Sequence, residues 1–105
     1  MNKVKVRFLY FEGCPHAEPA LKLLRETLKE LNVQGEIEIT EVKTLEDAER
    51  YNFLGSPTIQ INGLDIEKRR RGERAVMGCR IYENGSGVPP KEMIIEAVRE
   101  LLGKD

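Results

Sequence analysis

Residues 4–17 of the chain read VKVRFLYFEGCPHA, a stretch that joins a strand pattern to a helix start through a cysteine. Val4–Phe11 first alternates apolar with charged side chains and then becomes apolar on both faces, which predicts a strand that becomes central and buried. Pro15 suits the first position of a helix, where proline is favoured. Cys14 therefore lies at a strand–helix junction, where free backbone N–H groups and the positive end of the helix dipole favour its thiolate.

Helix and strand patterns alternate after this junction. Leucines at helical spacing predict a helix over residues 15–31, and a β-prone run predicts the next strand over residues 36–42. Thr44, followed three residues later by Asp47, resembles a capping box and predicts a short helix that ends near Tyr51. The chain thus begins as strand, helix, strand and helix.

The second half of the chain opens with a hairpin signal. Thr58–Ile61 and Leu64–Ile66 are short β-prone runs on either side of Asn62-Gly63, a dipeptide that strongly favours a tight hairpin turn. Residues 67–78 fit no element. Cys79–Tyr82 then predicts a further short strand.

A final helix is expected after Pro89-Pro90, because the apolar residues that follow have helical spacing. The resulting order is β-α-β-α-β-β-α, which predicts an α/β fold with a central mixed four-stranded sheet flanked by helices. A chain of 105 residues is the size of one small domain, so we expect residues 1–105 to form a single domain.

Composition makes several function classes unexpected. The formal net charge of −1 gives no electrostatic argument for nucleic acid or for an anionic membrane surface. Met1–Val6 carries charges and no continuous apolar stretch, so we expect no signal peptide, no membrane span and a cytoplasmic location. Two cysteines, Cys14 and Cys79, are too few for a disulfide scaffold, and a reducing compartment would keep both as thiols.

The chain resembles the thioredoxin superfamily over nearly its whole length. The resemblance rests on the element order, on Cys14 at the first strand–helix junction and on Ser56-Pro57-Thr58 before the third strand. It implies a thioredoxin-like fold in which Pro57 is a cis-proline that lies against the active-site cysteine. Ser56 and Pro15 are then residues that shape this site.

The cysteine motif is similar to that of one branch of the superfamily. Cys14-Pro15-His16 resembles the Cys-Pro-His-Cys motif of the oxidising branch, but Ala17 stands where that motif has its second cysteine. The stretches over residues 11–15, 53–58 and 79–82 look like those of small prokaryotic thioredoxin-like proteins. Because the neighbouring thiol is missing, a mixed disulfide at Cys14 needs another thiol to resolve it.

The resemblance implies thiol–disulfide exchange with protein or small-molecule thiols and disulfides, glutathione among them. Cys14 would attack a disulfide as a thiolate, and either Cys79 or an external thiol would resolve the mixed disulfide. Cys79 can serve only if its Cα comes within about 7 Å of that of Cys14, and its alternative is a packed strand cysteine. His16 either lowers the pKa of the Cys14 thiol as an imidazolium or is a solvated surface residue.

The basic run Lys68, Arg69, Arg70 and Arg71 has two interpretations. It is either a solvated loop or an anion-attracting rim over the cysteine, suited to glutathione carboxylates or to an acidic partner. No aromatic platform or recognised motif accompanies these charges, so nucleic acid is not an expected partner.

Neither a metal site nor a cofactor is expected. Two cysteines and one histidine fall short of the four ligands of a closed structural metal site. Two other function classes stay open: a non-catalytic redox-sensing or partner-binding module, and a soft-metal or metalloid (mercury or arsenic) thiol-binding protein that uses Cys14 and Cys79. The sequence leaves the oligomeric state open.

Overall fold

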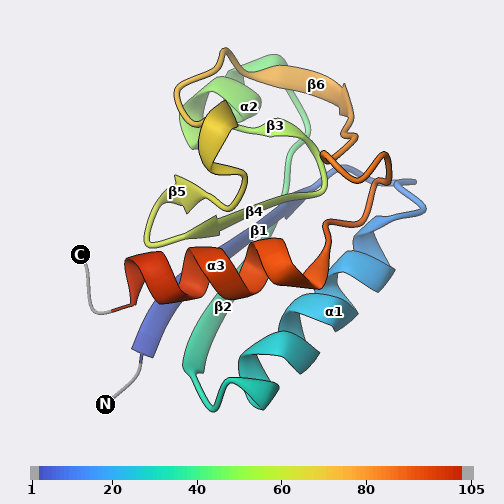
Figure 1. Cartoon of the computed structure of the whole chain (residues 1–105). Coiled ribbons are helices and arrows are strands. Elements are labelled where there is room, and N and C mark those ends of the chain that lie inside the picture. Colours follow the sequence, from blue (N-terminus) through green and yellow to red (C-terminus); the bar gives the residue numbers. More distant parts are fainter. Residues whose placement is uncertain (1–2, 103–105) are drawn as a thin grey trace.

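A computed structural model of the protein describes residues 3–102, so Met1 and Asn2 of the N-terminal stretch lie outside the described residues. Figure 1 shows the arrangement of its elements along the chain. In chain order they are β1 (Lys3–Tyr10), α1 (Ala17–Glu30), β2 (Gln34–Glu41), α2 (Leu45–Tyr51), β3 (Leu54–Ser56), β4 (Thr58–Ile61), β5 (Leu64–Asp65), the 3-10 helix η1 (Lys68–Arg70), β6 (Val76–Cys79) and α3 (Lys91–Leu101).

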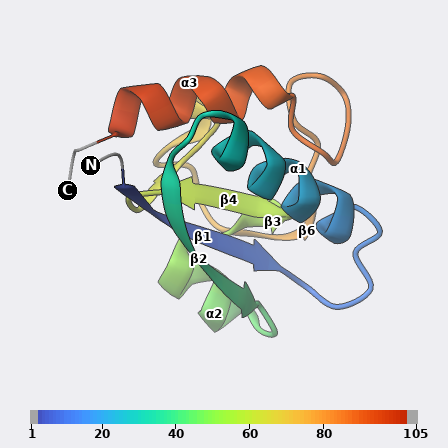
Figure 2. The ribbon, with the colours of Figure 1, turned by 90° about the horizontal axis from the view of Figure 1, so that it is seen from below.

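The larger sheet has the strand order β2-β1-β4-β5 and is mixed. β1 runs parallel to β2 and antiparallel to β4, and β4 and β5 form an antiparallel hairpin. Helices α1 and α3 cover one face of this sheet and α2 lies on the other (Figure 2). The expected α/β fold, with a mixed four-stranded sheet flanked by helices, is thus confirmed.

β1 lies between two apolar clusters. Val4, Val6 and Phe8 face the larger cluster, which α1 and α3 complete, whereas Leu9 belongs to a smaller cluster with Val42, Ala48 and Phe53. Side chains of a strand point alternately to its two faces, so β1 can serve both clusters at once. Burial on both faces holds the strand firmly, and with it the turn that leads to Cys14.

Local signals for the turns and caps are confirmed. Asn62 and Gly63 have φ angles of 50° and 87°, the left-handed conformations that a two-residue hairpin needs. The Thr44 side chain accepts a hydrogen bond of 3.0 Å from the Asp47 N–H at the start of α2. In residues 3–102, no helix is long and apolar enough to cross a membrane.

The region after the hairpin differs from the expectation. The strand predicted over Cys79–Tyr82 lies three residues earlier, as β6, and pairs in parallel with β3. η1 occupies part of the stretch that fitted no element. The sequence predicts no separate strand at β3, a three-residue segment with Gly55 in its middle. In the structure Gly55 has a φ of 104°, and β3 pairs with β6.

Candidate functional site

The turn between β1 and α1 carries Cys14. Its N–H donates to the Phe11 carbonyl at 3.3 Å, and its own carbonyl accepts from the Ala17 N–H at 3.4 Å. The cysteine is half-buried and its thiol is free. The helix begins at Ala17 with His16 as N-cap. Pro15 therefore lies just before the helix, whereas the sequence predicts it at the first helical position. Cys14 still lies at the positive end of α1.

His16 packs against the loop that precedes α3. A Cβ atom added to Gly87 would lie 2.3 Å from Cδ2 of the imidazole, so only glycine fits at this buried position. The loop is closed by hydrogen bonds of 2.8 Å from the Tyr82 N–H to the Ser86 carbonyl and from the Gly85 N–H to the Tyr82 carbonyl. The imidazole is therefore half-buried against this loop. The interpretation of His16 as a solvated surface residue does not describe this position.

The cis-proline turn, Ser56-Pro57, is buried beside the Cys14 turn. Its peptide bond is cis. The Ser56 hydroxyl accepts a hydrogen bond of 3.2 Å from the Phe11 N–H, while the Phe11 carbonyl accepts from the Cys14 N–H. Phe11 thus links the two turns directly, and the structure brings Cys14, Ser56 and Pro57 together at one end of the sheet.

Cys79 reaches the same turn from the other side. It is the last residue of β6, and its Cα is paired with that of Ser56. Its side chain is exposed and its thiol is free, so its interpretation as a packed strand cysteine is wrong. A Cβ atom on Gly55 would lie 3.0 Å from the Gly78 carbonyl, which shows how closely β3 and β6 approach. In both ribbon views the end of β6 and the turn before α1 lie at the same end of the molecule (Figures 1 and 2).

A buried ionic cluster supports the cis-proline turn, and sequence analysis missed it. We call it the Arg80 network: Arg80, Asp65, Glu67 and Tyr82, all buried. The Arg80 guanidinium donates to both carboxylate oxygens of Asp65, at 2.8 and 2.7 Å, and to Glu67 at 3.1 Å. Its Nε has no hydrogen-bond partner among the described residues. Burial by itself would lower the pKa of Arg80, but these carboxylates outweigh it and raise that pKa.

The Arg80 network contacts the cis-proline turn at two points. The Tyr82 hydroxyl donates a hydrogen bond of 2.5 Å to the Pro57 carbonyl. The Arg80 N–H donates to the Ser56 carbonyl at 3.1 Å. The Arg80 guanidinium also lies 4.1 Å from the centre of the Tyr82 ring, a cation–π contact in a buried setting. Both carbonyls of the turn are therefore held from one side.

Burial raises the pKa of the Tyr82 hydroxyl, although the Arg80 charge opposes this effect. One sequence signal pointed to the Arg80 network. Arg80 and Tyr82 alternate within the Cys79–Tyr82 run, and Asp65 and Glu67 have the same spacing after the hairpin. Residues two apart on extended chain share a face, but only the tertiary structure shows that the two faces meet.

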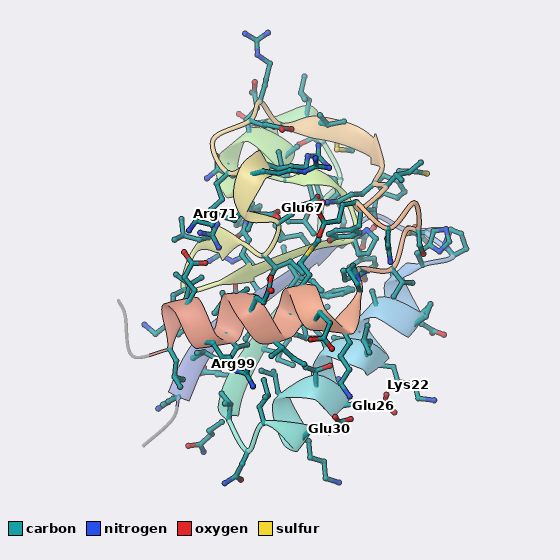
Figure 3. The ribbon with its side chains drawn as sticks, in the orientation of Figure 1. Lys22, Glu26, Glu30, Glu67, Arg71 and Arg99 are labelled. Carbon is teal, nitrogen blue, oxygen red and sulfur yellow. The ribbon has the colours of Figure 1, made fainter. Side chains whose placement is uncertain are left out.

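The basic run has carboxylate partners of its own. Both terminal nitrogens of Arg71 donate to Glu100, at 3.0 and 3.1 Å, and its Nε donates to the Asp65 carbonyl at 2.7 Å. Lys68, Arg69 and Arg70 lie 3.7–4.0 Å from Glu100 or Glu67. Figure 3 shows Arg71 on the side of β5, whereas α1 begins at the opposite side of the molecule (Figure 1). The anion-attracting rim over the cysteine stays a prediction.

No group of three or more histidine, cysteine or acidic side chains that could hold a metal ion exists among residues 3–102.

Comparison with known proteins agrees with this geometry. The chain is 29% identical to a thioredoxin of Methanocaldococcus jannaschii over 103 residues, which cover 97% of this chain and all of that protein. No family model matches the sequence, and no solved structure matches it significantly. The mixed sheet flanked by helices, the cysteine before α1 and the likeness to a thioredoxin over nearly the whole length together support the resemblance of this chain to the thioredoxin superfamily.

Proposed function

We propose that this protein is a thiol–disulfide oxidoreductase-like protein in which Cys14 is the nucleophile. The protein that this chain resembles over nearly its whole length is a thioredoxin, so the expected partners are protein thiols and disulfides. One observation carries the proposal: the half-buried, free Cys14 lies in a turn that is hydrogen-bonded through Phe11 to the cis-proline turn. The Cys14 thiol lies before the start of α1, beside the backbone of the cis-proline turn.

In the first step, the Cys14 thiolate attacks one sulfur of a substrate disulfide. A mixed disulfide forms at Cys14, the substrate S–S bond breaks, and the second substrate sulfur leaves as a thiolate that takes up a proton. In the second step, another thiolate attacks the Cys14 sulfur. The remaining substrate sulfur then leaves reduced, and the two electrons have come from Cys14 and the resolving thiol.

The resolving thiol is either Cys79 or an external thiol such as glutathione. Ala17 supplies no thiol at the usual neighbouring position. Cys79 is free, exposed and paired with Ser56, whose hydroxyl contacts the turn before Cys14. This placement supports Cys79 as the first candidate in an intramolecular step, because intramolecular thiols act at high effective concentration. We propose that His16, fixed under the Gly87 loop, supports the thiolate of Cys14.

The test is the intact mass of the protein after incubation with oxidised glutathione without reductant. Wild type is compared with Cys79→Ser and Cys14→Ser. A loss of two hydrogens that disappears in both variants shows a Cys14–Cys79 disulfide and a displaced resolving thiol. A single glutathione adduct that persists in Cys79→Ser and is absent from Cys14→Ser shows a monothiol site. Full turnover of an insulin-reduction assay by Cys14→Ser would refute the proposal.

The alternative of a non-catalytic redox sensor predicts a different pair of results. Cys14 would be modified in the mass experiment, yet wild type would reduce no insulin disulfide above the rate of the reductant alone. The turnover assay therefore separates the two functions.

A further inference from the structure

β6 and the segment just after it, up to Ile81, expose apolar side chains near Cys79. Val76 is 44% exposed, Met77 40% and Ile81 67%, and Cys79 itself is exposed. Single exposed apolar residues are common, but a run of them on one strand commonly marks a contact surface. β6 exposes Val76, Met77 and Cys79 in this way, and Ile81 adds a further exposed apolar side chain two residues beyond the end of the strand.

The outer edge of β6 is also unpaired. Its sheet consists of β3 and β6 alone, so in the described part of the chain no other strand lies along the second edge of β6. Proteins usually protect an exposed edge with charged side chains or proline, and Val76-Met77-Gly78-Cys79 contains neither. An extended peptide that adds a strand to such an edge gains backbone hydrogen bonds and contacts to alternate side chains.

The position of this edge relates it to the proposed redox site. β6 ends at Cys79, opposite Ser56 of the cis-proline turn. A segment paired along β6 would therefore extend toward Cys14, which lies beyond the same turn. The end of β6 and the turn before α1 lie at the same end of the molecule (Figures 1 and 2), so a disulfide at that end of the bound segment would be presented to Cys14.

The positive charge of Arg74, just before the start of β6, indicates which charge the bound segment carries. Arg74 is exposed two residues before the strand and has no ion-pair or hydrogen-bond partner among residues 3–102. The adjacent arginines Arg69, Arg70 and Arg71, in contrast, lie near carboxylates of the chain itself. A free guanidinium here favours a carboxylate on the bound segment.

We propose that β6 is the docking strand for protein substrates: it binds an extended, apolar polypeptide segment whose disulfide lies at the Cys79 end of the strand, where Cys14 attacks it, and whose acidic residue faces Arg74 at the other end. The proposal rests on the proposed function of Cys14 and gives it a substrate class. Small disulfides, which make no contact with β6, would react without this assistance.

The experiment compares two disulfides at fixed pH in single-turnover reactions, so that only the attack by Cys14 is measured. Insulin is the protein substrate and bis(2-hydroxyethyl) disulfide is the small one. Met77→Glu and Ile81→Glu are expected to lower the second-order rate constant with insulin about tenfold, since a charge opposes burial of an apolar segment. The same variants should react with the small disulfide within about twofold of wild type, because this disulfide is too small to contact β6 while it reacts with Cys14.

Leu64→Glu is the matched control, because Leu64 is 42% exposed on β5, outside the docking strand. It should leave both rates unchanged. Equal loss in Leu64→Glu, or unchanged insulin rates in both β6 variants, would overturn the docking strand while leaving Cys14 as nucleophile. If wild type reacts with neither disulfide, the proposed function itself fails. A concentration-dependent dimer that Met77→Glu dissolves would also overturn the proposal, because a second copy would then occupy β6.

The charge preference has a separate test. Two disulfide-linked model peptides differ only in a glutamate or a lysine in the apolar segment. Wild type should react faster with the glutamate peptide, and Arg74→Glu should reverse the order. Equal rates for the two peptides would remove the acidic residue from the partner description.

Discussion

Two parts of the molecule that meet at the cis-proline turn bury their side chains in opposite ways. β1 and α1 bury apolar residues such as Phe8 and Leu24, and their charged side chains remain outside. The segment from Asp65 to Tyr82 instead buries Arg80 between two carboxylates. An apolar core gains free energy in proportion to the area removed from water, whereas a buried ion pair must first overcome the desolvation of its charges.

This difference determines which substitutions lower the stability of each part. An apolar core tolerates similar apolar residues and loses stability gradually as methylene groups are removed. A buried ionic cluster is neutral or mildly costly when complete, but it becomes strongly destabilising when one partner is removed. The Arg80 network holds the two carbonyls of the turn next to Cys14, so its failure would reach the proposed site directly.

The largest expected effect is that of Arg80→Ala. Removal of the guanidinium leaves Asp65 and Glu67 buried without their cation, which should cost about 3–5 kcal/mol of unfolding free energy. Urea unfolding measures this loss. The control is a triple variant, Arg80→Met with Asp65→Asn and Glu67→Gln, which removes every charge and should be more stable than Arg80→Ala. A triple variant as unstable as Arg80→Ala would mean that packing and not charge dominates in this region.

Leu24→Ala tests the apolar half. Leu24 is fully buried under the sheet, and its truncation should cost about 3 kcal/mol through lost transfer energy and a cavity. Leu24→Met, which conserves volume, should lose less than about 1.5 kcal/mol. Because the cis-proline turn is held by hydrogen bonds from Arg80 and Tyr82, which Leu24→Ala leaves in place, the rate of Cys14 alkylation in the folded protein should stay close to that of wild type. A clearly changed alkylation rate would show that the apolar cluster shared by Leu24 and Tyr82 also positions Cys14.

Tyr82→Phe should have the smallest effect on stability, about 1 kcal/mol, because it removes one hydrogen bond to the Pro57 carbonyl and keeps the ring. The variant also tests the raised pKa of Tyr82. Below about pH 10 both the folded and the unfolded protein hold the tyrosine proton, so this group adds no pH dependence.

Above that pH the unfolded chain loses the proton first, and wild type should lose stability as pH rises toward the folded-state pKa. Urea midpoints at pH 9 and pH 11 measure this loss, which should be smaller in Tyr82→Phe. Equal losses in the two proteins would show that Tyr82 does not titrate with a raised pKa.

Local patterns predicted most of the secondary structure up to Gly63. The buried strand before Cys14, the Thr44 cap and the Asn62-Gly63 hairpin depend on interactions between residues close in sequence, and all three are confirmed. β6 was misplaced by three residues, because a four-residue strand without a clear alternation has no local signal of its own. Its position follows from pairing with β3, more than twenty residues earlier in the chain.

The sequence by itself determined the fold class and the strand–helix junction that carries Cys14, whereas the role of Ser56 and Pro57 in the turn beside it followed from the resemblance to the thioredoxin superfamily. Alternation, helical spacing and turn propensity act within a few residues, so they can be recognised without a structure. Only the tertiary structure decided that Arg80 binds Asp65 and Glu67, that Tyr82 holds the Pro57 carbonyl, and that Cys79 lies exposed opposite Ser56. These contacts join residues 13 to 25 positions apart, and they are stable only because folding removes water from all of them together.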